Sequence, residues 1–187
     1  MTTIKLTIIG KGIVGKSFLI YRFFDKKRSE EYVPTVEMKY SKTEIIDGMN
    51  TNLEILDTAG EDDYQNLFDI WINYADGILL VFAVNDKDSF TELEEKYKRI
   101  RQIKGKKFPI VLIGNKIDLP KREITMEEAL KKAEEWGIPY FETSALENTN
   151  CKEPFLHAAK VIIPKIRKAT STSGSQHGVK KCPCLII

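Results

Sequence analysis

The chain has 187 residues, of which 42% are hydrophobic and 30% are charged, and its formal net charge is +2. This length favours one domain with a buried core. The near balance of charge argues against nucleic-acid binding through bulk electrostatics, and no apolar run reaches the roughly 18 residues of a membrane span. The N-terminus does not resemble a secretory signal. Because the three cysteines are odd in number, we expect a reduced cytosolic protein without a disulfide framework.

Short apolar runs rich in β-branched residues alternate with helical patterns along the chain. These runs show little polar alternation, which is typical of strands covered on both faces of a parallel sheet. Asp47-Gly48 predicts a short hairpin, so one edge strand should be antiparallel. The predicted strands are 4–10, 38–47, 53–57, 77–83, 110–115 and 139–143.

Amphipathic patterns between the strands predict helices at 16–25, 64–74, 87–104, 126–136 and 151–168. Ser89 with Glu92 and Thr125 with Glu128 have the spacing of capping boxes. Pro164 is expected to kink or shorten the last helix, because its ring displaces a helical hydrogen bond.

The alternation of strands and helices predicts an α/β fold. We expect a doubly wound, mostly parallel six-stranded sheet with one antiparallel edge strand and a ligand at the carboxyl ends of the strands. Residues 1–168 should form this domain. The small, polar residues that follow predict a flexible tether over 169–187.

The first strand leads into GKGIVGKS at residues 10–17, which matches the phosphate-loop pattern G-x-x-x-x-G-K-[ST]. Gly10 and Gly15 would let backbone N–H groups surround phosphate oxygens. Lys16 would neutralise phosphate charge, and the Ser17 hydroxyl would bind Mg²⁺. A glycine-rich turn with an exposed lysine is the alternative. A chance match is about one in a hundred or rarer, and the flanking strand and helix reduce it further.

Asp57 ends a later strand and begins the sequence DTAG. Its carboxylate can hold Mg²⁺ through water, and the Gly60 N–H can meet a γ-phosphate. Alone, DTAG is as well explained by a solvated turn. Thr35, in EYVPTVE, is a candidate second hydroxyl ligand for Mg²⁺, and Pro34 favours an extended backbone before it.

The sequence NKID at 115–118 follows the fifth predicted strand, where a base would be expected. Asp118 can accept hydrogen bonds from N1–H and the exocyclic amine of guanine, whereas adenine offers no N1–H. Asn115 can tie this loop to the phosphate loop, and the stem of Lys116 can cover the ring. Ser144 and Ala145, in ETSAL, are expected near guanine O6.

In this order the motifs resemble the Ras superfamily of small GTPases over roughly residues 4–168. YVPT is as similar to Rho as to Ras, but the chain lacks the Rho helical insertion. The resemblance implies the small G-domain fold of P-loop NTPases, which binds GTP or GDP with Mg²⁺ and hydrolyses GTP. It implies catalytic roles for Lys16, Thr35, Gly60 and Glu61, and nucleotide contacts from Gly12, Ile13, Val14, Gly15, Lys16, Ser17, Phe18, Arg28, Tyr32, Pro34, Thr35, Gly60, Asn115, Lys116, Asp118, Leu119, Ser144, Ala145 and Leu146.

The resemblance also implies partners. Effector proteins would contact the switch regions around 32–40 and 60–72, and an exchange factor and a GTPase-activating protein (GAP) would act on a monomer. Neither the phosphate loop nor residues 57–64 contain an arginine, so we expect an arginine from a partner. No nucleic-acid partner is expected.

The chain departs from the family pattern at several positions. Leu146 replaces the lysine of the usual SAK triplet. Arg28 replaces a phenylalanine that lies against guanine. Arg28 can stack on the base, but we expect it to point to solvent and to weaken nucleotide retention. Met38 and Lys39 replace acidic and hydroxyl residues, which predicts a different effector set.

Glu61 replaces the usual glutamine of the family. A carboxylate accepts hydrogen bonds but cannot donate one to a phosphate oxygen. We therefore expect intrinsic hydrolysis to survive and stimulation by a GAP to be impaired. The alternatives are a GTP-binding scaffold that barely hydrolyses GTP and a P-loop kinase of small metabolites, against which NKID argues.

The last four residues, Cys184 to Ile187, form a C-a-a-X ending. Its terminal isoleucine favours geranylgeranylation of Cys184. Because one lipid anchors only marginally, Cys182 is a candidate palmitoylation site. Unmodified thiols on a frayed end are the alternative. We expect a lipid-anchored protein on the cytoplasmic side of a membrane, the plasma membrane in particular.

Overall fold

The structure, a computed structural model, describes residues 2–25, 37–60 and 65–173. Within them a six-stranded sheet has the order β2-β3-β1-β4-β5-β6. All neighbouring strands are parallel except β2 and β3. The predicted mostly parallel sheet with one antiparallel edge is therefore confirmed. The strands are β1 Thr2–Ile9, β2 Glu37–Ile46, β3 Met49–Thr58, β4 Gly77–Ala83, β5 Ile110–Asn115 and β6 Tyr140–Thr143.

The predicted hairpin joins β2 to β3. Ile46 pairs with Met49, so the loop contains only two residues. Asp47 and Gly48 have φ angles of 48° and 75°, and two left-handed residues match the twist of an antiparallel pair.

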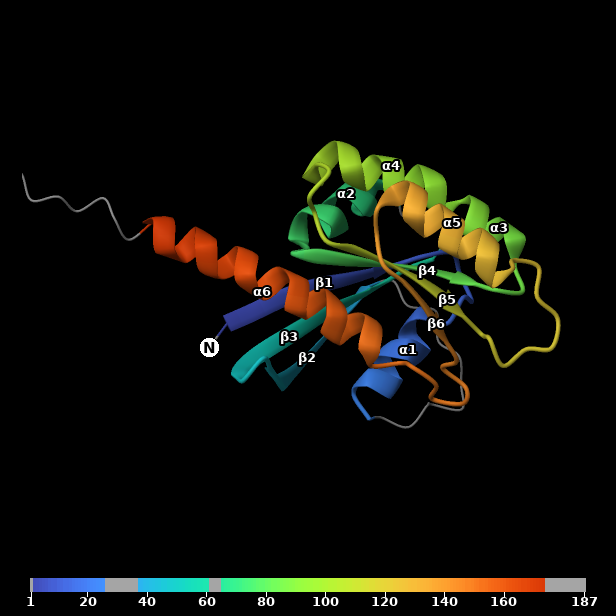
Figure 1. The fold of residues 1–187 in the computed structure, drawn as a ribbon, viewed down its shortest axis with the longest axis horizontal. Helices are drawn as coiled ribbons and strands as arrows, with labels where there is room; N and C mark the ends of the chain where they lie inside the picture. Colours follow the sequence, from blue (N-terminus) through green and yellow to red (C-terminus); the bar gives the residue numbers. More distant parts are fainter. Residues whose placement is uncertain (1, 26–36, 61–64, 174–187) are drawn as a thin grey trace, which may run out of the picture.

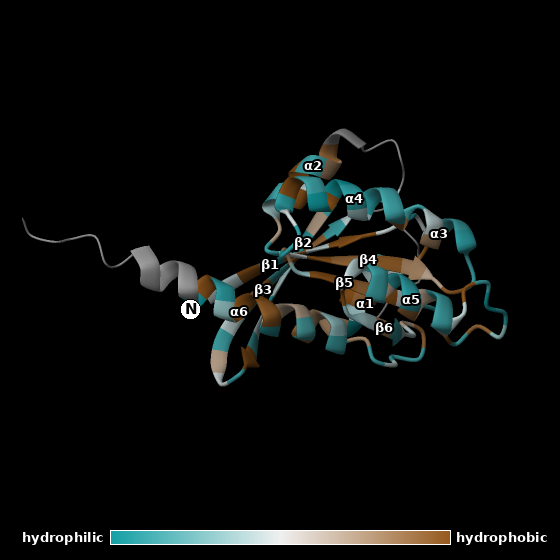
Figure 2. Ribbon diagram, turned by 45° about the horizontal axis from the view of Figure 1, so that its top comes forward, coloured by the Kyte–Doolittle hydropathy of each residue, from teal (hydrophilic) through white to brown (hydrophobic). Residues whose placement is uncertain are grey.

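Helices cover both faces of the sheet (Figure 1). Helices α1 and α6 pack on one face, and α2, α4 and α5 pack on the other. Every residue of β4 and β5 is buried between these layers. These two central strands are apolar, while the outer faces of the helices are polar (Figure 2). The helices are α1 Lys16–Phe23, α2 Gln65–Tyr74, α3 Lys87–Thr91, α4 Leu93–Lys104, α5 Met126–Trp136 and α6 Glu153–Ser173.

One of the two predicted capping boxes is wrong. The helix predicted at 87–104 is divided into α3 and α4, and the N-cap of α3 is Asp86, which accepts from the Ser89 N–H at 3.0 Å. The Ser89 hydroxyl instead accepts from the Ala83 N–H at the end of β4, at 3.1 Å. The box of Thr125 and Glu128 is confirmed, with both of its hydrogen bonds present.

Helix α6 is longer than predicted. It continues through Pro164 to Ser173, so Pro164 does not shorten it. Pro164 and Lys160 are both exposed. We infer that water can satisfy the Lys160 carbonyl, which lowers the cost of the lost helical hydrogen bond. None of the described helices is long and apolar enough to cross a membrane.

Candidate functional site

The loop between β1 and α1 is pressed against two neighbouring strands. A Cβ atom at Gly10 would collide with the Val81 carbonyl of β4, and one at Gly15 would collide with the Asn115 side chain. Gly15 also has a φ of 98°, which favours glycine. The loop therefore lies at the carboxyl ends of the central strands, and α1 begins directly after it at Lys16 (Figure 1).

Lys16 is held inside this loop. Its side chain is folded back so that Nζ donates to the carbonyls of Gly10 and Lys11, each at 2.9 Å. Burial lowers the pKa of Lys16 to about 8, Asp57 opposes this shift and Lys96 adds to it. The loop thus holds a buried cation whose present partners are neutral carbonyls, which an anion can replace.

Asp57 lies next to this cation near the end of β3 and is fully buried. Within the described part of the chain, neither carboxylate oxygen has a hydrogen bond of ordinary geometry. Burial raises the Asp57 pKa, while the nearby Ser17 hydroxyl and Lys16 ammonium oppose the rise. A buried carboxylate with so few partners is costly. Together with the Ser17 hydroxyl it is an oxygen set of the kind that Mg²⁺ prefers.

Gly60 packs directly on the phosphate loop. A Cβ atom there would collide with the backbone of Lys11 and Gly12. A substitution would have to move one of these backbones, because none of the colliding atoms belongs to a flexible side chain. The segment that follows Asp57 is therefore in contact with the phosphate loop.

Asn115, the last residue of β5, joins three parts of the site. Its Nδ2 donates to the Val14 carbonyl at 2.9 Å. Its Oδ1 accepts from the Thr143 hydroxyl at 3.0 Å and from the Ala145 N–H at 3.2 Å. The sequence predicted the tie to the phosphate loop, and the structure adds the tie to the end of β6.

Asp118 is positioned by the loop after β6. The Ser144 hydroxyl donates to Asp118 Oδ1 at 2.5 Å and accepts from the Glu147 N–H at 3.0 Å. Ser144 and Thr149 also exchange backbone hydrogen bonds of 3.1 and 2.9 Å. This small bridge fixes the loop that holds the carboxylate.

Three residues at the site carry contacts that the motifs did not predict. Arg22, on α1, donates from Nε to the Ala145 carbonyl and from Nη2 to the Leu146 carbonyl, both at 2.7 Å. Lys11 points away from the phosphate loop toward acidic groups on and near α3, with Nζ 3.4 Å from the Glu92 carboxylate. Thr143 binds Asn115 as described above. Thr143 had a usable signal, a hydroxyl at the end of a strand beside the site, whereas Arg22 and Lys11 had none.

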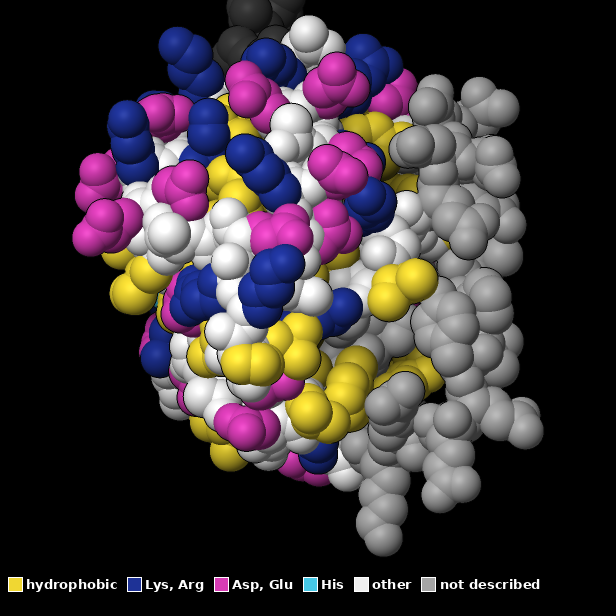
Figure 3. Space-filling model, turned by 90° about the vertical axis from the view of Figure 1, so that its right-hand side faces the viewer, with side chains coloured by type: hydrophobic (Ala, Val, Ile, Leu, Met, Phe, Trp, Pro, Cys, Tyr) yellow, Lys and Arg dark blue, Asp and Glu magenta, His cyan; other side chains and the backbone are white. Residues whose placement is uncertain are grey.

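The remaining predicted residues range from buried to exposed. Val14 is buried, Phe18, Lys116 and Leu119 are half-buried, and Ile13 and Leu146 are exposed. Acidic, basic and hydrophobic side chains are interspersed on this end of the molecule (Figure 3). The predicted residues Arg28, Tyr32, Pro34, Thr35, Glu61, Cys182 and Cys184 lie outside the described residues.

A comparison with models of protein families matches residues 5–164 to the Ras family. The chain belongs to the Ras family. The matched region contains the phosphate loop, Asp57, NKID and ETSAL. This Ras-family protein is therefore a small GTPase signalling switch, and effectors, exchange factors and GAPs act on the family in general.

Proposed function

We propose that this Ras-family protein binds GTP and GDP together with Mg²⁺, hydrolyses GTP, and works as a lipid-tethered switch. The observation that supports this most strongly is the pairing of buried Lys16 with buried Asp57, whose oxygens are nearly without partners. The Lys16 ammonium suits a phosphate, and the Asp57 carboxylate suits a metal ion. Burying each of these charges costs free energy when neither ligand is bound.

Mg²⁺ would be held by Ser17, by Thr35 and, through water, by Asp57. When bound, the ion would neutralise part of the charge of the phosphates. Lys16 would exchange the carbonyls of Gly10 and Lys11 for β- and γ-phosphate oxygens. Because Lys16 is buried, this ion pair would form in a weakly screened environment. The phosphate would also raise the lowered Lys16 pKa and keep the side chain charged.

Guanine selection would rest on Asp118. Ser144 already holds Asp118 Oδ1 in place, so the carboxylate is oriented before the base arrives. Ala145 N–H donates to Asn115 in this structure. A contact with guanine O6 would therefore share that donor, and it remains a prediction.

Hydrolysis would proceed by attack of a water oxygen on the γ-phosphorus. The bond to the β–γ bridging oxygen breaks, GDP leaves with its electron pair, and the protons of water pass to phosphate and solvent. Glu61 would accept a hydrogen bond from that water, and the Gly60 N–H would meet the γ-phosphate. The Glu61 charge would oppose closure on the γ-phosphate by about 1 kcal/mol at 4 Å in water and by several kcal/mol in a drier site.

Nucleotide extraction followed by single-turnover hydrolysis of bound GTP tests this proposal on the purified full chain. We expect guanine nucleotide and slow conversion to GDP. Glu61→Gln should increase stimulation by a GAP, whereas Asp62→Asn, which removes a neighbouring charge, should not. Bound GTP that is never hydrolysed would favour the scaffold, and bound ATP would overturn the assignment of the base.

The surface around β2 and α2 is the proposed effector site. Met38 and Ile70 are 51% and 59% exposed, and Lys39 lies 4.6 Å from the centre of the Tyr74 ring. This basic and apolar surface should disfavour basic effector domains. Tight GTP-dependent capture by such a domain would contradict this.

We also propose that Cys184 is prenylated, that Cys182 is the second lipid site, and that the protein is a monomer on the cytoplasmic side of the plasma membrane. Cys184→Ser should release the protein from membranes, and Cys182→Ser should only weaken its retention. Incubation with each prenyltransferase in vitro would distinguish geranylgeranyl from farnesyl.

A further inference from the structure

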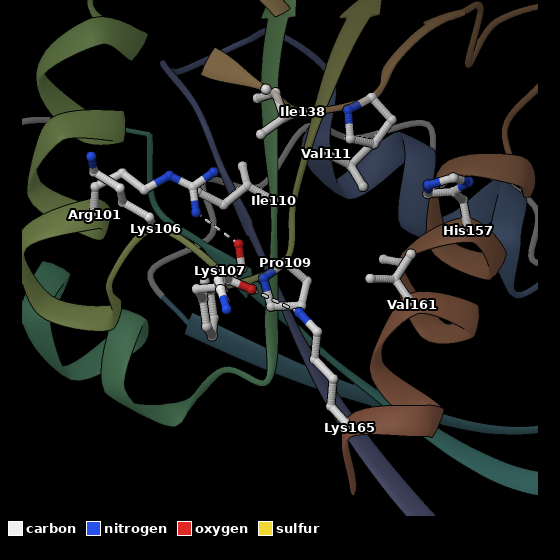
Figure 4. Close-up of a pocket in the computed structure, with 14 residues that line it drawn as sticks. Arg101, Lys106, Lys107, Pro109, Ile110, Val111, Ile138, His157, Val161 and Lys165 are labelled. Carbon is white, nitrogen blue, oxygen red and sulfur yellow. Dashed lines mark hydrogen bonds between the residues drawn. The ribbon is translucent and has the colours of Figure 1, made fainter. Parts of the chain in front are cut away.

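A pocket of about 370 Å³ lies at the end of the sheet opposite the phosphate loop. Its floor is the beginning of β5, at Ile110 and Val111, and its walls come from α4 with the loop after it, the loop before β6, and α6 (Figure 4). Asn115 is four residues farther along β5, which corresponds to about 13 Å. The pocket is therefore separate from the proposed nucleotide site.

The rim of this pocket is strongly basic. Arg101, Lys106, Lys107 and Lys165 line it together with His157, and none of the described lining residues is an Asp or Glu. Elsewhere on the surface several lysines have acidic partners, as in the pair of Lys98 and Glu94 at 3.0 Å. The chain has nearly equal numbers of basic and acidic residues, so a pocket with only basic charges is a local departure from its overall balance.

Two of these cations are held in place by neutral groups. Arg101 Nη1 donates to the Phe108 carbonyl at 2.8 Å, and Lys165 Nζ donates to the Lys107 carbonyl at 2.7 Å (Figure 4). These bonds fix the cations without cancelling their charge. Burial lowers the Lys165 pKa, and the positive charge of Arg101 lowers it further. An anion in the pocket would relieve that repulsion.

The interior between these cations is apolar. Pro109, Ile138 and Val161 line it, and Val161 remains 40% exposed. A cationic rim around an apolar hollow suits a ligand whose negatively charged groups reach the rim while an uncharged ring turns its C–H face to the hollow.

We propose that this pocket binds the phosphorylated headgroup of an anionic phospholipid, a phosphoinositide, at a membrane surface. Helix α6 forms one wall through His157, Val161 and Lys165 (Figure 4). The helix then continues to Ser173. Cys184 is the eleventh residue after Ser173, and eleven steps along an extended chain span at most about 40 Å. A membrane contacted through the C-terminus would therefore lie within reach of the pocket. Binding of the headgroup in the pocket does not itself require a lipid on the tail.

Sedimentation with vesicles tests this proposal on the full-length, unlipidated protein loaded with GDP. The vesicles contain phosphatidylcholine with either a phosphoinositide bisphosphate or enough phosphatidylserine to give the same total charge. The test variant is Lys106→Ala/Lys165→Ala. The control is Lys131→Ala/Lys160→Ala, which removes the same charge from two exposed lysines outside the pocket.

We expect the unaltered protein to prefer phosphoinositide vesicles. The test variant should bind them about tenfold or more weakly, because both lysines line the pocket and each contributes to attraction by a charged bilayer. The control variant should lose less than half of that effect. Equal loss in both variants, or equal binding to phosphatidylserine vesicles, would show general electrostatics and overturn the proposal. The proposal would also be overturned if the protein bound the soluble inositol phosphate as tightly as it binds phosphoinositide vesicles. The ligand would then be a free anion and not a lipid in a membrane.

Discussion

Replacing Asn115 with alanine tests whether the side chain that joins β5 to the phosphate loop controls nucleotide retention. The change removes three buried hydrogen bonds, to the Val14 carbonyl, the Thr143 hydroxyl and the Ala145 N–H. Each buried group left without a partner costs about 1–3 kcal/mol. Because Thr143 can rotate its hydroxyl, we expect a loss of about 3 kcal/mol in the free energy of unfolding.

Part of this loss should appear in the rate of nucleotide release, because we expect the loops that Asn115 joins to separate when the nucleotide leaves. If all of it does, about 3 kcal/mol corresponds to release about a hundredfold faster. Thr143→Val removes only one of the three bonds and should cost about 1 kcal/mol. The rates are measured by displacing a fluorescent GDP analogue with unlabelled GDP, and stability is measured by urea unfolding.

Ile100→Ala is the control for general destabilisation. Ile100 is fully buried in the cluster formed by α4 and the far face of the sheet, and a cavity there should cost about 2–5 kcal/mol. Equal acceleration of release by Ile100→Ala and Asn115→Ala at similar stability would refute a specific role of Asn115. So would an Asn115→Ala protein that is destabilised but releases GDP at the unaltered rate.

Four further predictions concern single residues. Ile13→Gly should raise the free energy of unfolding in urea by about 1 kcal/mol, because Ile13 is β-branched at a φ of 66° and is 75% exposed; no change would show that the loop is not strained there. The Asp57 pKa is raised in the folded protein, so as pH rises the carboxyl group loses its proton in the unfolded chain before it does so in the folded one. The free energy of unfolding of the nucleotide-free protein should therefore fall as pH rises from 3.8 through the raised pKa. Asp57→Asn should abolish this fall and also the stabilisation by added Mg²⁺, and a variant that Mg²⁺ still stabilises would contradict the assignment. The Lys16 pKa is lowered to about 8, so stability should rise with pH between about 8 and 10.5, and Lys16→Met should flatten that rise. Thr125→Ala breaks the capping box with Glu128 and should lower the melting temperature through a loss of about 1 kcal/mol, whereas an unchanged melting temperature would mean that the cap contributes nothing.

The fold was predictable where local signals are strong. β4 and β5 are uninterrupted apolar runs that are buried along their whole length. Asp47-Gly48 forms a two-residue turn with positive φ angles, a conformation that few residue pairs adopt easily. The cap of α3 was not predictable in the same way. Asp86 and Ser89 both have side chains suited to an N-cap, and the choice depends on the Ala83 N–H, which draws the Ser89 hydroxyl toward the sheet.

The site shows the same division. The predicted contact between Asn115 and the loop after β1 is present, because it follows from the order of the strands. Arg22 reaches carbonyls more than a hundred residues away in the chain. A basic residue in the last turn of a helix normally favours that helix's own carbonyls, so nothing local in the sequence distinguishes this arginine from an ordinary helix-end cation.

β5 also determines how the two ends of the molecule relate to each other. It is hydrogen-bonded to a strand on each side and buried along its whole length, and a shift by one residue would turn every side chain to the wrong face. It therefore acts as a strut of fixed length between Val111 in the basic pocket and Asn115 beside the phosphate loop. At this separation the effects of substitutions usually add. The strut should thus let the proposed membrane contact and the proposed nucleotide chemistry be altered independently, although a single strand of six residues contributes to both sites.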